Sequence, residues 1–336
     1  MIGRREFIAG LGGAAAFPLA APAQHSELSV IGFLHAATVE SYVSDGAGFA
    51  EGLKTAGFAE AQNLAIEYRF ANGQPDQLPA LATDLVRREV ALIVAGGDAR
   101  AAVAAKAATS TIPVVFVLGS DPLRLGLVAS IDRPGGNVTG ATFVTAGLMA
   151  KKLALAHQLV PRATSVGYLA EDPQAYVSDT AMARTIEDMK SEIQAAAEPL
   201  GWPVIVAEIG RDHDYEQAFA TFVEGRIGAL VVAPSAVFAN DADEIVAFAA
   251  RHEIPTICPR RADVVAGGLM SYGARQADAW REAGILVGNL LKGAAPARMP
   301  VMRSTRLELV IGQATAKSLC LTVPPTLIGL ADEVIE

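Results

Sequence analysis

The alternation of short apolar runs with longer amphipathic runs is the feature that most constrains the fold of this chain. Residues 28–34 (LSVIGFL) are continuously apolar, as expected of a strand that is covered on both faces. Residues 39–56 place Phe49 and Leu53 on one helical face, and Gly57 then ends the pattern. Strand and helix runs that alternate in this way are typical of parallel sheets joined by crossover helices. The sequence therefore predicts an α/β protein.

The alternation occurs twice. A first series ends with a strand at 114–118, and a second series begins with a helix at 148–159. Between them lies 133–140 (RPGGNVTG), a loop-rich stretch that indicates a boundary. We therefore expect two similar doubly wound parallel-sheet lobes joined by a hinge. A single eight-stranded barrel is the structural alternative, although it requires neither the helical segment at 278–291 nor the long tail.

These patterns divide the chain into five predicted parts. They are a signal peptide at 1–23, an N-terminal lobe at 24–140, a C-terminal lobe at 141–267, a return to the N-terminal lobe at 268–296, and a crossover with a C-terminal tail at 297–336. The hinge is expected near 136–142 and 267–273, with a third crossing near 294–300.

The first 23 residues have the order of an export signal. Arg4 and Arg5 precede an uncharged apolar run at 9–20, and the small residues 21–23 (APA) provide a cleavage pattern before Gln24. Paired arginines followed by Phe7 fit a twin-arginine signal, but general secretion remains open as the route. We expect cleavage after Ala23 and a periplasmic mature protein.

Composition and motifs narrow the function further. A formal net charge of −9 argues against a nucleic-acid partner. Cys258 and Cys320 have no metal-ligand spacing, and they are either two reduced thiols or a single bridge. No nucleophile elbow, phosphate-binding loop or zinc-protease motif occurs, so we expect no catalytic residue, no metal and no cofactor.

Candidate ligand-binding residues follow from the predicted strands. In parallel sheets a ligand binds beyond the carboxyl ends of the strands, and two facing lobes would enclose it in a cleft. The residues in such positions are His35, Ala36, Ala37, Gly97, Asp98, Ser120, Asp121, Glu171, Asp172, Pro234, Ser235 and Tyr272. Asp98 also stands where it would cap the helix that follows, and Tyr272 could stack on a flat ligand.

An ordered series of segments resembles a known family. The segments are 57–58 (GF), 63–69 (NLAIEYR), 77–82 (QLPALA), 105–116 (AKAATSTIPVVF), 120–122 (SDP), 126–130 (GLVAS), 133–140 (RPGGNVTG), 307–311 (LELVI), 315–317 (TAK), 323–325 (VPP) and 331–335 (ADEVI). Together they resemble the substrate-binding proteins of ABC transporters, whose tryptophan- and tyrosine-type members have a type I periplasmic binding fold. The resemblance implies a monomer that delivers a small, amino-acid-like or aromatic solute to a membrane permease.

The sequence departs from the family pattern in two places. Asp98 stands where family members often have Thr or Ser, and Glu171 and Asp172 replace amides of an Asn-Pro-Asn stretch. Acidic groups there favour an amine-bearing or hydroxylated ligand. Because carboxylates can also perform acid–base chemistry, a periplasmic enzyme on the same scaffold is one alternative. A ligand sensor that signals to a membrane kinase is another.

Overall fold

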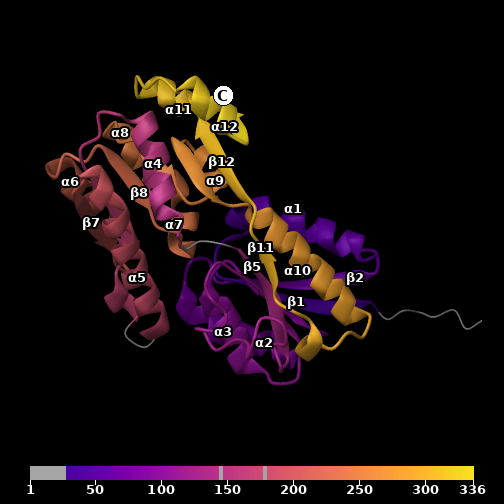
Figure 1. The fold of residues 1–336 in the computed structure, drawn as a ribbon. Coiled ribbons are helices and arrows are strands. Elements are labelled where there is room, and N and C mark those ends of the chain that lie inside the picture. Colours follow the sequence, from indigo (N-terminus) through magenta and orange to yellow (C-terminus); the bar gives the residue numbers. More distant parts are fainter. Residues whose placement is uncertain (1–27, 144–146, 177–179) are drawn as a thin grey trace, which may run out of the picture.

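The computed structural model describes residues 28–143, 147–176 and 180–336, which form two α/β lobes side by side (Figure 1). The predicted signal peptide lies outside the described residues. No helix in the described ranges is both long and apolar enough to cross a membrane. The two lobes confirm the predicted fold class, and no single closed barrel is present among the described strands.

The first lobe is built on a six-stranded sheet with the order β11-β5-β4-β3-β1-β2. All of its neighbouring strands are parallel. The strands are β1 (Ser29–His35), β2 (Leu64–Phe70), β3 (Ile93–Gly96), β4 (Val114–Leu118), β5 (Val138–Phe143) and β11 (Met302–Ser304). Because β1 lies between β2 and β3, consecutive connections leave in opposite directions at this point, which makes the β1/β3 edge the topological switch point.

Helices cover both faces of this sheet. On one face α1 (Val39–Thr55) and α10 (Gln276–Leu291) pack on the strands, and on the other lie α2 (Leu78–Arg87) and α3 (Ala99–Ala108). The amphipathic pattern of α1 agrees with its place, because Phe49 and Leu53 are buried in the cluster beneath it.

The second lobe repeats the plan with a seven-stranded sheet in the order β13-β12-β10-β9-β8-β6-β7. Its strands are β6 (Val166–Glu171), β7 (Val204–Ile209), β8 (Ala229–Val232), β9 (Thr256–Cys258), β10 (Met270–Ala274), β12 (Leu307–Gly312) and β13 (Glu333–Ile335). Among the described strand pairs of this sheet, β10–β12 alone is antiparallel. The helices are α4 (Met149–Leu159), α5 (Thr180–Ala197), α6 (Tyr215–Glu224), α7 (Ala236–Asn240), α8 (Ala242–Arg251), α9 (Arg261–Val265), α11 (Gln313–Ser318) and α12 (Pro325–Leu330). Here β6 lies between β7 and β8, so the switch point is at the β6/β8 edge.

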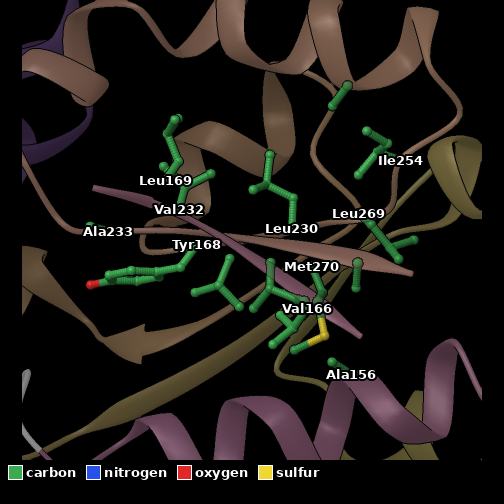
Figure 2. Packing of buried hydrophobic residues seen from close by; sticks show 14 of the residues in the cluster. Ala156, Val166, Tyr168, Leu169, Leu230, Val232, Ala233, Ile254, Leu269 and Met270 are labelled. Atoms are coloured by element: carbon green, nitrogen blue, oxygen red, sulfur yellow. The ribbon is translucent and has the colours of Figure 1, made fainter. Parts of the chain in front are cut away.

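The core of the second lobe lies on both faces of its sheet. Figure 2 shows Tyr168 and Met270 on the side of α4, and Leu169 and Leu230 on the opposite side. Side chains of successive strand residues alternate between faces, so burial of both Tyr168 and Leu169 requires helices on each side. This burial on both faces explains why residues 166–170 (VGYLA) contain no charged residue.

The lobe boundaries differ from the predicted ones. The boundary expected after residue 140 falls inside β5, which continues to Phe143. Gly140 pairs with Phe116 of β4, and a Cβ on Gly140 would lie 2.3 Å from the Phe116 carbonyl oxygen. Gly140 thus permits close strand packing instead of a turn. The return expected at 268–296 begins too early, because β10 pairs with β9 and β12 in the second sheet and only α10 belongs to the first lobe.

The polypeptide changes lobe at three places in the described chain. It passes from β5 to α4, from β10 to α10 and from β11 to β12. The third crossing therefore lies between residues 304 and 307, after the 294–300 stretch predicted for it. The last two crossings run side by side, and the Arg275 N–H donates to the Arg306 carbonyl over 2.9 Å.

Replacing Gly52 by Ala tests the contact between α1 and α10. A Cβ on Gly52 would lie 2.0 Å from the Arg281 carbonyl oxygen, so both helices would have to separate. We expect Gly52→Ala to lower the free energy of unfolding by about 2 kcal/mol, measured by urea denaturation. Gly136→Ala is the control, because a Cβ there has no neighbour within 4 Å. Equal stability of the two variants would contradict the tight helix contact.

Candidate functional site

A cleft of about 370 Å³ lies between the lobes. The ends of strands at both switch points line it. His35 ends β1 and Gly97 follows β3 in the first lobe, while Glu171 ends β6 and Ser235 follows β8 in the second. An open α/β sheet binds its ligand at the edge that contains the switch point. Both lobes therefore present this edge to the same cavity.

Charged groups from both lobes meet at one side of the cleft. Asp98 caps α3 by accepting from the Arg100 backbone N–H over 2.8 Å, as expected from its position. The Arg100 guanidinium also donates to both carboxylate oxygens of Asp98, over 2.9 and 2.5 Å. From the other lobe, Glu171 approaches Arg100 to 4.0 Å. Asp98, Arg100 and Glu171 thus form a charged cluster that includes residues of both lobes, and each side chain is at most 10% exposed.

Glu171 is the buried acid of the second lobe. Burial raises its pKa above the ordinary carboxyl value, while the positive charge of Arg100 and a hydrogen bond with Ser235 act in the opposite direction. Ser235 also caps α7 by accepting from the Val237 and Phe238 N–H groups. A buried carboxylate with incomplete compensation favours a ligand that brings a donor.

His35 is held in the wall of the first lobe. Its side chain is buried, and Nδ1 accepts from the Ala37 N–H over 3.2 Å. Burial lowers the pKa of His35 to about 4, so the ring is neutral at pH 7. The ring lies against the backbone of Gly97, where a Cβ would be 2.5 Å from the Cε1 atom. Gly97 thus leaves the space that the imidazole occupies.

A second wall of the cleft comes from α5. This wall is apolar where Met182, Ile186 and Met189 line it and charged at Asp188 and Glu192. Sequence reasoning missed it, because an amphipathic helix does not reveal whether its inner face covers a sheet or a cavity. Arg184 of α5 also lines the cleft, and the other lining residues that were missed include Ser41, Arg124, Phe143, Arg260, Gln276 and Trp280.

The lobes touch at the rim of the cleft through Asn240, at the end of α7. Its Oδ1 accepts from the Thr38 N–H over 2.9 Å and from the Ser41 hydroxyl over 3.2 Å. Both donors lie at the start of α1 in the other lobe, where backbone N–H groups have no partner within the helix. This side-chain amide of one lobe therefore serves as a cap for a helix of the other.

Two ion pairs also connect the lobes. Arg124 meets Asp188 over 2.9 Å, and Arg211 meets Asp76 over 2.6 Å. All four side chains are more than half exposed, so each pair contributes about 0–1 kcal/mol.

Most of the predicted ligand-binding residues line the cleft, and three do not. The lining residues are His35, Ala37, Gly97, Asp98, Ser120, Asp121, Glu171, Pro234 and Ser235. Ala36 is buried in the first core instead, and Asp172 lines a separate surface hollow, where it accepts from the Gln174 N–H over 2.8 Å. Tyr272 lies in β10 and packs against the second core. It was misplaced because the strand that carries it was assigned to the returning segment.

Polar residues at the start of α6 make local contacts outside the cleft. Asp214 caps α6, and the His213 Nδ1 lies 2.8 Å from the Asp241 Oδ2. Cys258 is buried, Cys320 is exposed, and the two are not bridged. Among the described residues no group of three His, Cys, Asp or Glu side chains is placed to hold a metal ion.

Comparison with known proteins identifies the family. The architecture is that of the type I periplasmic binding proteins. The model of the ABC transporter substrate-binding protein family matches residues 29–335, and the chain therefore belongs to that family. This family consists of solute-binding proteins.

Individual relatives agree with this result. A tyrosine-binding protein of Clostridioides difficile is 26% identical over 272 residues, which cover 81% of this chain and 75% of the relative. A Streptococcus pneumoniae ABC domain solved with L-Trp is 24% identical, with a TM-score of 0.78 over 91% of this chain and 99% of that one. A conserved domain protein of Vibrio cholerae is 21% identical, with a TM-score of 0.80 over 92% and 100% of the two chains.

The neutral state of His35 makes stability depend on pH. Its pKa is lowered in the folded state, so on acidification the unfolded chain takes up a proton near pH 6.5 before the folded protein does. Stability is therefore lost as pH falls below 6.5. From pH 7.5 to pH 5 this group should contribute a loss of about 2 kcal/mol, measured by urea denaturation. His35→Gln should lack this component, and an unchanged pH dependence in the variant would contradict a buried neutral ring.

Proposed function

We propose that the protein is the exported solute-binding component of an ABC importer, which encloses a small amino-acid-like or aromatic molecule in the interlobe cleft and passes it unchanged to a permease in the inner membrane. The observation that carries the proposal is the cleft itself, to which both lobes contribute their switch points. Membership of the family and the names of the tyrosine-binding and L-Trp-bound relatives support it. The export pattern in the first 23 residues supports a periplasmic location.

The electrostatics provide a reason for closure to depend on ligand. When the lobes separate, water can solvate Glu171, and when they close its carboxylate loses that water. Arg100 compensates only in part, because its guanidinium already binds Asp98. A ligand with an amine or hydroxyl donor supplies the missing interaction, so it binds the closed state in preference to the open one.

A melting-temperature screen of the mature chain tests binding. We expect at least one compound among amino acids, aromatic acids and polyols to stabilise the protein. At a concentration of 100 times Kd the stabilisation should be about 2.7 kcal/mol. The compound should be recovered chemically unchanged after prolonged incubation. Conversion to a product would favour an enzyme, and the absence of any stabilising compound would contradict the proposal.

Asn240→Ala tests whether the rim contact belongs to the closed state. Asn240 does not line the cleft, but the substitution removes both of its hydrogen bonds to the other lobe. At about 1 kcal/mol for each of the two bonds, we expect Kd for the stabilising compound to rise about 30-fold, measured by titration calorimetry. The melting temperature without ligand should stay the same.

Arg211→Ala is the matched control for this experiment. It also removes an interlobe contact, but one between exposed groups, so we expect Kd to change by less than about 3-fold. If Asn240→Ala left Kd unchanged, closure of the lobes would not be linked to binding through this contact.

A further inference from the structure

His35 carries a buried hydrogen-bond donor without a partner. The side chain is 3% exposed, and its Nε2 atom has no hydrogen-bond partner among the described residues. Because Nδ1 accepts from the Ala37 N–H, the proton of the neutral ring is on Nε2. Buried N–H groups without a partner are rare and costly in folded proteins, so this one requires an explanation.

The ring cannot readily turn to find a partner within its own lobe. Its centroid lies 5.3 Å from that of Tyr42, 5.6 Å from that of Phe70 and 5.9 Å from that of Trp280. These aromatic rings and the backbone of Gly97 hold the imidazole in the cleft lining. The donor is thus fixed in position before any ligand enters.

The acceptors nearby are unequal. Both carboxylate oxygens of Asp98 are bound by the Arg100 guanidinium, and one also accepts the Arg100 backbone N–H. Among the residues that the structure describes, Glu171 has Ser235 as its hydrogen-bonding neighbour and Arg100 at 4.0 Å. Among the buried acids of the cleft, Glu171 is therefore the one with capacity for a ligand donor.

We propose that His35 determines the ligand class: its Nε2–H donates to an oxygen of the ligand head group, while Glu171 accepts from an ammonium group of the same head. This inference rests on the proposed function, which places the ligand in the cleft. A head group with a carboxylate and an amine on neighbouring atoms, as in an α-amino acid, supplies both partners. The apolar remainder would face Met182, Ile186 and Met189 of α5.

The arrangement makes the two ends of the head group separable by experiment. Suitable probes are L-tyrosine, tyramine, which lacks the carboxylate, and 3-(4-hydroxyphenyl)propionate, which lacks the amine. Each analogue leaves one buried protein group unsatisfied, so we expect each to bind about 10- to 100-fold more weakly than L-tyrosine in titration calorimetry.

Variants assign each loss to a residue. His35→Phe keeps a ring but removes the donor. It should therefore weaken the binding of L-tyrosine by about 10-fold or more and leave the affinity for tyramine unchanged. Glu171→Gln should weaken the binding of L-tyrosine and of tyramine but leave the affinity for 3-(4-hydroxyphenyl)propionate unchanged. His35→Gln places an amide N–H near the Nε2 position and should recover most of the L-tyrosine affinity. Melting curves of each variant without ligand verify that it folds.

The outcomes separate this inference from the proposed function. If His35→Phe weakens the binding of L-tyrosine and of tyramine equally, the ring has a structural role and the inference is wrong. If the cleft binds a solute without an amine or without an acceptor oxygen, and no amino acid, the inference fails while the proposed function stands. If no small molecule binds the wild-type protein, the proposed function itself fails.

Discussion

Burial of the parallel strands on both faces is the constraint on which the rest of the structure depends. β3, β4 and β8 are buried along their whole length, and β6 is buried up to its last residue, Glu171. Polar side chains that can contact a ligand then lie at the strand ends. They gather at the switch point, where neighbouring connections leave in opposite directions. Two such lobes with their switch points facing each other create one cavity. The site is thus a consequence of topology more than of any single motif.

The same burial determines how charge is distributed around the cleft. The first lobe contains its own balanced pair, Asp98 with Arg100, and a neutral His35. The second lobe contributes the acid Glu171, whose pKa is raised by burial. In the proposed function, closure would bring this carboxylate into an environment that compensates its charge incompletely. Under that proposal, a ligand that supplies the missing donor would also hold the lobes together, which would link the conformational change to the chemistry of the ligand.

Much of the fold and part of the site could be predicted from the sequence, for identifiable reasons. Apolar runs such as 28–34 locate strands, and a residue that follows a strand, such as Gly97 or Ser235, lies at the cleft wherever the sheet is parallel. Tyr272 was misplaced because periodicity gives the type of an element but not the sheet that it joins. Arg100 was missed because its role depends on the rotamer that reaches Asp98. The lining face of α5 was missed because helical amphipathicity is the same against a core and against a cavity.

Measurement of the distance between the lobes tests the central claim most directly. Val103 of α3 and Val223 of α6 are exposed side chains on different lobes and are suited to spin labels, once the exposed Cys320 is replaced by Ser. Pulsed electron paramagnetic resonance should show a broad distribution without ligand and a single narrow one with the stabilising compound bound. A distribution that stays the same at saturation would contradict closure of two lobes around a guest.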